Sequence, residues 1–143
     1  MSRPPASSKK TSRSILLVED DAFVRQYLVG VLESLGYEVT ACSDGPTALA
    51  EAARPQHHFN LLITDVMLPG GLLGREVADT LARDYPQTRV LFISGYPEHD
   101  LHEKGILREN VLLLKKPFRR ATLAKAVHEA LYSNGPQLFG SAK

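Results

Sequence analysis

Short apolar runs alternate with amphipathic stretches along almost the whole chain, and this alternation restricts the fold more than any other feature. Four runs are continuously apolar: Ile15–Val18, Leu61–Ile63, Val90–Ile93 and Val111–Leu114. Runs of this length are typical of strands that are covered on both faces, as in a parallel sheet. A fifth segment, Tyr37–Thr40, alternates in polarity, so we expect it near an edge of the sheet.

The stretches between these runs have the spacing of helices that cover such a sheet. The first contains an apolar stripe at helical spacing, formed by Val24, Tyr27, Leu28, Val31, Leu32 and Leu35. Asp21 is the expected N-cap of this helix and Gly36 its expected C-terminal stop. Further stripes predict helices that end before Pro55 and before Pro86, and a C-terminal helix around Leu123–Leu131. A polar, less periodic helix is expected over 97–106.

Five strands and five helices in strict alternation, strand first, predict an α/β fold. We expect a doubly wound five-stranded parallel sheet, (βα)5, with the flavodoxin-like strand order 2-1-3-4-5. One domain over residues 15–132 fits a chain of 143 residues. Residues 1–14 hold four basic side chains and no acidic one, which predicts a disordered basic leader. A short C-terminal tail is expected over 133–143, after Asn134-Gly135-Pro136.

Charge and composition narrow the classes of function. The formal net charge is +1, and without the four basic residues of the leader it falls to −3, so no direct nucleic-acid binding is expected. No apolar run is long enough to cross a membrane, and none follows the basic N-terminus as in a secretory signal. Cys42 is the only cysteine and has no partner for an internal disulfide. The sequence therefore predicts a cytoplasmic protein.

Reactive side chains follow four of the five expected strands. These side chains are contributed by Glu19-Asp20-Asp21, Thr64-Asp65, Ser94-Gly95 and Lys115-Lys116-Pro117-Phe118. In doubly wound sheets the carboxyl ends of the strands carry the binding site, so we expect carboxylates, a hydroxyl and an ammonium group in one depression. Carboxylates placed this close repel one another unless a cation is present, and Mg²⁺ suits such oxygen ligands. A cation, an ammonium group and a hydroxyl together suit a phosphoryl group, which a carboxylate can accept as a nucleophile.

These segments, with Asp65-Val66-Met67-Leu68-Pro69-Gly70, resemble the receiver domain of two-component response regulators over about Ile15–Tyr132. The resemblance implies a phospho-accepting receiver of a phosphorelay, either stand-alone or of the hybrid-histidine-kinase type. Its expected phosphodonor is a histidine kinase or a phosphotransfer protein, and phosphorylation is expected to switch the binding of a downstream protein. A homodimer that forms on phosphorylation is a further partner that the resemblance allows. It implies no enzymatic activity beyond the domain's own phosphorylation and dephosphorylation.

The resemblance also assigns roles around the metal. Asp65 corresponds to the phospho-acceptor and Asp20 to a direct Mg²⁺ ligand. Glu19 is expected to act on the metal through water, and the backbone carbonyl of Met67 to complete the ligand set. Asp21 is the rival for a metal role, but the position of the motif after Val18 favours Glu19 and Asp20.

Two further residues are expected to act on the phosphoryl group. Ser94 corresponds to the switch hydroxyl and Lys116 to the lysine that faces the phosphoryl group. The peptide bond between Lys116 and Pro117 resembles the cis peptide of the family, which aims the ammonium group.

The resemblance also implies how three further positions would behave. Met67 and Tyr96 stand two residues after the acceptor and two after the switch hydroxyl, the places that in receivers govern access of hydrolytic water. A thioether barely accepts hydrogen bonds and a tyrosine is bulky, so slow self-dephosphorylation is expected. Leu113 stands where many receivers have an aromatic residue three positions before the lysine. Weaker coupling to the face built by the fourth helix, fifth strand and fifth helix is therefore expected.

Other functions remain as alternatives. An unphosphorylated protein-interaction domain of the same fold is one, although it has little use for the whole charge set. An aspartate-nucleophile phosphatase is another, but it requires Asp-x-Asp after its strand. A nucleotide- or flavin-binding module requires a phosphate-binding loop where this chain has Asp20-Asp21-Ala22.

Smaller features have simple structural interpretations. Asp20 and Asp21, taken alone, are helix caps more often than metal ligands. His99 and His102 are expected on a solvated face, and His57-His58 in an exposed loop. Cys42 is expected to be half-buried and unreactive.

Overall fold

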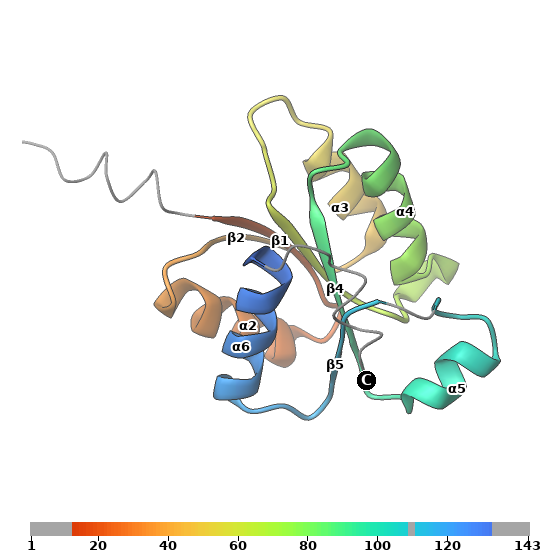
Figure 1. The fold of residues 1–143 in the computed structure, drawn as a ribbon. Coiled ribbons are helices and arrows are strands. Elements are labelled where there is room, and N and C mark those ends of the chain that lie inside the picture. The colour runs from red at the N-terminus through yellow and green to blue at the C-terminus, as the bar shows by residue number, and fades with distance from the viewer. Residues whose placement is uncertain (1–12, 109–110, 133–143) are drawn as a thin grey trace, which may run out of the picture.

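The structure, a computed structural model, describes residues 13–108 and 111–132. Its five strands form one parallel sheet in the order β2-β1-β3-β4-β5, which confirms the predicted α/β fold (Figure 1). The strands are β1 (Ser14–Val18), β2 (Glu38–Cys42), β3 (Leu61–Asp65), β4 (Arg89–Ser94) and β5 (Leu113–Lys115). The helices are α2 (Ala22–Ser34), α3 (Gly45–Ala52), α4 (Gly74–Asp84), α5 (Glu98–Glu103) and α6 (Arg120–Tyr132), with a 3-10 turn, η1, at Pro69–Gly71.

Helices cover both faces of the sheet. Helices α2 and α6 lie on one face, and α3 and α4 on the other (Figure 1). Successive residues of a strand point to opposite faces, so β1 contributes Ile15 and Leu17 to the core under α2 and α6, and Leu16 and Val18 to the other core. This two-sided burial explains why the central strands are continuously apolar rather than alternating.

The helix boundaries follow the signals in the sequence. The Asp21 carboxylate accepts hydrogen bonds from the backbone N–H groups of Phe23 (2.9 Å) and Val24 (3.1 Å), and thereby caps α2. After α2 the chain turns at Gly36, whose φ of 97° lies in the left-handed region that favours glycine. The prediction of a helix within 97–106 is confirmed by α5.

The strand boundaries differ from the prediction in several places. Strand β2 is an edge strand, as expected, but it extends to Cys42, which is buried rather than half-buried. Burial raises the pKa of the Cys42 thiol to about 11, so this cysteine is unreactive. Strand β5 begins at Leu113 rather than Val111, because its pairing with β4 starts at the Phe92–Leu113 pair. Ser14, placed in the leader by the sequence analysis, begins β1 and pairs with Glu38.

The rest of the predicted leader, except Arg13, and the predicted C-terminal tail lie outside the described residues. Within 13–108 and 111–132, no helix is long and apolar enough to cross a membrane.

Candidate functional site

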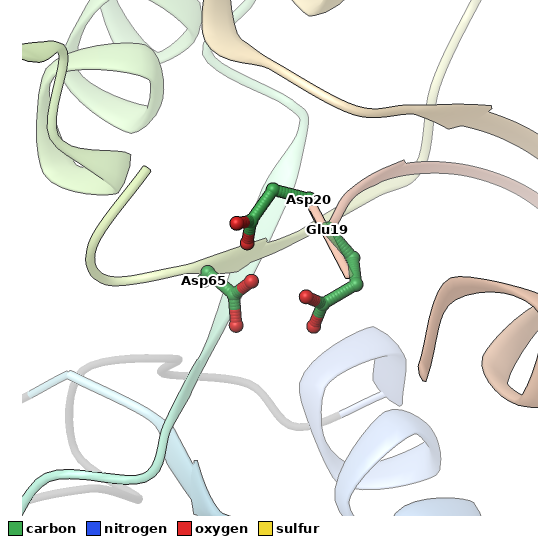
Figure 2. A group of neighbouring side chains, drawn as sticks. All are labelled: Glu19, Asp20 and Asp65. Carbon is green, nitrogen blue, oxygen red and sulfur yellow. The ribbon is translucent and has the colours of Figure 1, made fainter. Parts of the chain in front are cut away.

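Three carboxylates converge at the carboxyl ends of β1 and β3. Glu19 and Asp20 follow β1, Asp65 ends β3, and the three side chains face a common space (Figure 2). One carboxylate oxygen from each lies within 4.8 Å of the other two. Glu19 and Asp65 are 1% and 5% exposed, whereas Asp20 is open to solvent. The parallel pairing of β1 with β3 brings these residues together, as the sequence predicted.

Lys116 supplies positive charge to two of these carboxylates. Its Nζ lies 2.9 Å from Glu19 Oε1 and 2.9 Å from Asp65 Oδ1. The lysine follows β5, its backbone N–H donates to the Ser94 carbonyl at 2.8 Å, and the Lys116–Pro117 peptide bond is cis, as the resemblance implied. Burial lowers the pKa of the ammonium group, but its hydrogen bonds to Asp65 and Glu19 outweigh burial and raise that pKa above its usual value. Lys116 is therefore a permanent cation at this site.

The single positive charge of Lys116 does not neutralise the three carboxylates of the site. Burial, followed by the interaction with Glu19, raises the pKa of Asp65 to about 8, although Lys116 opposes this shift. Asp65 Oδ2 is buried and has no hydrogen-bond partner among the described residues. Buried carboxylate oxygens are normally satisfied, so this free oxygen and the excess negative charge fit a small hard cation such as Mg²⁺.

Backbone contacts hold the acidic segment after β1 in place. The Asp21 N–H donates to Glu19 Oε2 at 3.0 Å, and the Arg25 guanidinium donates to the Glu19 carbonyl at 2.8 Å. Because the carboxylate of Asp21 caps α2, it is committed to the helix rather than to the space between Glu19 and Asp65. The sequence analysis missed Arg25, since its contact is with a backbone carbonyl and leaves no pattern in the side chains.

Gly74 packs directly against the backbone of Asp65. It begins α4, its N–H donates to the Val66 carbonyl at 2.8 Å, and a Cβ at this position would collide with the Asp65 carbonyl oxygen. The Thr64 hydroxyl also donates to that oxygen, at 3.0 Å. The close approach of α4 to the end of β3 therefore requires glycine. Sequence analysis also missed this role, because it depends on a contact between two elements.

The remaining predicted residues surround the acidic group. Ser94 ends β4 and is buried, and its hydroxyl accepts a hydrogen bond from the Tyr96 N–H at 2.9 Å. Met67 follows β3 and is 40% exposed, and Tyr96 is 54% exposed. The structure thus clusters the carboxylates of Glu19, Asp20 and Asp65, and pairs Lys116 with two of them. Ser94 at the end of β4, and Met67 and Tyr96 in the loops that follow β3 and β4, lie at the same edge of the sheet.

Three histidines lie beside glutamates elsewhere in the fold. His99 lies 3.3 Å from Glu103, and His102 lies 3.9 Å from Glu98, both along α5. His57 Nε2 lies 3.0 Å from Glu51 Oε1, and its ring stacks on Phe59. Among the described residues, the acidic group of Glu19, Asp20 and Asp65 is the one cluster of three or more ligand-type side chains.

The sequence matches the family described as "Response regulator receiver domain" over residues 15–128. The chain belongs to this family. Among curated relatives of this receiver, "Response regulator receiver protein CpdR" of Brucella abortus is 31% identical over 119 residues, which cover 83% of this chain and 97% of that protein. "Sensor kinase CckA" of the same organism is 32% identical over 129 residues, 88% of this chain but 13% of that protein.

The fold of this receiver is also that of solved structures. The chemotaxis response regulator CheY4 of Vibrio cholerae has a TM-score of 0.72 and is 29% identical, and the match covers 85% of this chain and all of that chain. Among these relatives, a receiver domain thus occurs both as almost an entire protein and as a small part of a longer one.

Proposed function

We propose that this receiver accepts a phosphoryl group on Asp65 from a phosphohistidine of a histidine kinase or phosphotransfer protein, with Mg²⁺ as cofactor. The observation that carries the proposal is the state of Asp65: a buried carboxylate with Lys116 on one oxygen and no partner for the other among the described residues. A purely structural carboxylate would be satisfied by its neighbours.

The transfer balances without any other reactant. A carboxylate oxygen of Asp65 forms a bond to phosphorus while the bond between phosphorus and the donor imidazole breaks, and the imidazole nitrogen keeps the electron pair and takes up a proton. Lys116 donates hydrogen bonds toward the transferred group, because its ammonium already lies 2.9 Å from Asp65. The positive charge of Lys116 thereby stabilises the negative charge that builds up on the phosphoryl oxygens, and electrostatic stabilisation of this kind is usually a large contribution in such reactions.

Mg²⁺ would be held by Asp20 and Asp65 directly, by the Met67 backbone carbonyl, and by Glu19 through water. Bound there, the metal would neutralise negative charge on the phosphoryl group. Ser94 would donate its hydroxyl hydrogen to a phosphoryl oxygen, while its oxygen can still accept from the Tyr96 N–H. These two hydrogen bonds through one hydroxyl would link phosphorylation to the loop after β4.

An apolar surface beside the site suits the phosphodonor. Phe23 is 86% exposed, Tyr27 is 45% exposed, and together with Phe118 they line a hollow of about 480 Å³. Lys116 borders both this hollow and the acidic group. A donor that brings its phosphohistidine to Asp65 therefore contacts this surface, and exposed aromatic residues are typical anchors of protein interfaces.

The wider setting follows from the same proposal. We assign the receiver domain to residues 15–132 of a cytoplasmic protein whose phosphorylation changes the binding of a downstream protein or of a second copy. Its own chemistry is confined to phosphorylation and dephosphorylation of Asp65. An interaction domain that is never phosphorylated is the second candidate.

Phosphorylation by a small acyl phosphate tests the proposal. Intact-mass spectrometry should show the gain of one phosphoryl group with acetyl phosphate and Mg²⁺, and none with excess chelator. Asp65→Asn should abolish the gain, and Asp20→Asn should raise the Mg²⁺ concentration required. Asp21→Asn is the matched control, because Asn caps α2 as well as Asp does and the gain should persist. Full labelling of Asp65→Asn would refute the assignment.

A further inference from the structure

The turn from β1 to α2 carries two of the three carboxylates on consecutive residues. Glu19 and Asp20 follow each other in the chain, yet their side chains face the same space as that of Asp65 (Figure 2). In an extended strand, consecutive side chains point to opposite faces, so the backbone must leave the strand conformation between these two residues. The chain bends at Asp20, two residues after the end of β1. The acidic group therefore depends on the shape of this turn.

The two carboxylates of the turn are held to different degrees. The N–H of Glu19 donates to the Cys42 carbonyl at 3.0 Å, and its Oε2 accepts from the Asp21 N–H at 3.0 Å. Its Oε1 lies 2.9 Å from Lys116 Nζ, so Glu19 is fixed at three points. The Asp20 side chain is exposed, so its direction depends on the backbone that carries it.

Arg25 of α2 contacts that backbone. Its Nη1 donates to the Glu19 carbonyl oxygen at 2.8 Å and lies 3.4 Å from the Asp20 carbonyl oxygen. The first carbonyl belongs to the peptide group that precedes Asp20, and the second to the peptide group that follows it. Peptide groups are planar, so holding both of them restricts the φ and ψ angles of Asp20 and thereby the direction of its Cα–Cβ bond. One guanidinium group thus contacts both peptide groups that determine where this carboxylate points.

Helix α2 itself gains nothing from the charge of Arg25. Arg25 is the fourth residue of this helix, near the end whose partial positive charge disfavours a cation. Burial raises the pKa of the Cys42 thiol and the Arg25 guanidinium opposes that shift, so the guanidinium lies near the end of β2. Strand β2 borders β1 on the side away from β3, which carries Asp65. Arg25 therefore holds the turn from the side away from Asp65, where it does not contact the metal or the phosphoryl group.

We propose that Arg25 is a positioning residue of the metal site: by holding the peptide groups on both sides of Asp20, it directs the Asp20 carboxylate toward the space between Glu19 and Asp65. The inference deepens the proposed function and rests on the Mg²⁺ site assigned there. Side chains that orient metal ligands without touching the metal commonly change metal affinity by roughly tenfold or more. Removing the positive charge of Arg25 would by itself favour a cation at the acidic group. Lost positioning and lost charge therefore change the Mg²⁺ affinity in opposite directions.

The first arm of the test measures the turn in the absence of metal. In chelator, the three-bond coupling between the amide proton and Hα of Asp20 reports its φ angle by NMR of the isotope-labelled full chain. Arg25→Met keeps the helix propensity of the residue but removes its charge and its donors, and it should change this coupling and the amide shifts of Glu19 and Asp20. Lys115→Met is the matched control: it removes a positive charge from an exposed residue at the end of β5 and should leave these signals in place.

The second arm measures Mg²⁺ affinity with the same signals. Arg25→Met should bind Mg²⁺ about tenfold more weakly than wild type, and Lys115→Met as tightly as wild type or slightly more tightly. Arg25→Lys keeps a charged donor, so its affinity should fall between those of wild type and Arg25→Met.

The results that would overturn this proposal differ from a failure of the metal site. Arg25→Met (or Arg25→Lys, where only that variant folds) that binds Mg²⁺ as tightly as wild type would overturn it and leave the proposed function intact. An unchanged φ coupling at Asp20 would do the same. A merely structural role of Arg25 would lower the free energy of unfolding in urea and leave the Mg²⁺ affinity unchanged, which also contradicts the proposal. Wild type that binds no Mg²⁺ would overturn the proposed metal site and this inference together.

Discussion

Two regions of the fold differ in how tightly they are held. One is the acidic group at the carboxyl ends of β1 and β3. The other is the edge of the sheet formed by β5, together with the neighbouring helix α5, and is called the α5–β5 edge below. At the acidic group, every residue of β3 is buried, and Glu19 and Asp65 are fixed by Lys116, Asp21 and Gly74. At the edge, β5 has three residues, and α5 has six residues and no side-chain N-cap. Its His99–Glu103 pair is 82% and 69% exposed.

The difference in packing suits the two regions to different parts of the proposed function. Charges that would repel one another stay close only in a rigid surrounding, so dense packing suits the chemistry that we propose at Asp65. A surface that is to respond to the proposed phosphorylation must change at low free-energy cost, as weakly held elements do. We therefore expect substitutions near Asp65 to act strongly and substitutions near Leu113 to act weakly.

The largest effect is expected from Gly74→Ala. The added Cβ collides with the Asp65 carbonyl oxygen, so either α4 or the end of β3 must move. We expect the free energy of unfolding to fall by about 3 kcal/mol, as for a severe overpacking substitution. Urea denaturation measures it. The matched control is Gly30→Ala, an exposed position in α2 with open space around it, which should stabilise the protein by about 0.5–1 kcal/mol. Equal effects of the two substitutions would show that Asp65 is not tightly enclosed.

The next effect concerns pH in the absence of Mg²⁺. The pKa of Asp65 is raised to about 8 in the folded chain, against about 3.9 in an unfolded one. Between these values the folded state binds more protons, so its stability falls as pH rises from about 4 to about 8. Asp65→Asn has no carboxyl group that must ionise in the folded state, so its stability should not fall in this way. Above pH 8 its free energy of unfolding should exceed that of wild type by on the order of 2 kcal/mol. Denaturation in chelator at several pH values checks this, with the surface substitution Asp84→Asn as control; parallel pH profiles for wild type and Asp65→Asn would contradict it.

The third effect is on the lifetime of the phosphorylated state. Met67 and Tyr96 flank the site with an apolar and a bulky side chain. Met67→Asn with Tyr96→Glu introduces groups that can orient water, and hydrolysis should accelerate about tenfold, a barrier change of about 1.4 kcal/mol. Loss of the phosphoryl group over time, followed by mass spectrometry, measures the rate. Met67→Leu with Tyr96→Phe keeps both sizes and should leave the rate nearly unchanged. A slower or unchanged rate in the first variant would reject the steric explanation.

The smallest effect is expected at Leu113. Leucine has no polar tip to return to water, so it has less reason than tyrosine to occupy an outward state. Coupling from Ser94 to α5, β5 and α6 should lie near the low end of the ~1–3 kcal/mol usual for such couplings. NMR of the free and beryllofluoride-bound protein should show small shifts at Leu113. Large shifts with a change of its rotamer would make Leu113 a switch and remove the contrast between the two regions.

The sequence predicted the well-packed region better than the edge. Apolar runs such as Ile15–Val18 are covered on both faces, and their composition alone marks them as central strands. The start of β5 was missed by two residues because it depends on where β4 offers partners. Arg25 and Gly74 were missed for a similar reason. Arg25 contacts the backbone carbonyl of Glu19, and Gly74 leaves space for the backbone carbonyl of Asp65. Sequence patterns record side-chain burial, whereas these roles arise from contacts between elements.

The central claim, that Asp65 takes a phosphoryl group in a site completed by Mg²⁺, is tested most directly by ¹⁹F NMR of beryllofluoride binding. Beryllofluoride mimics a phosphoryl group on a carboxylate and needs neither a kinase nor turnover. We predict bound resonances in wild type and in the control Asp21→Asn when Mg²⁺ is present, their loss in chelator, and their absence in Asp65→Asn. Bound resonances that persist in Asp65→Asn, or that form without Mg²⁺, would contradict this account.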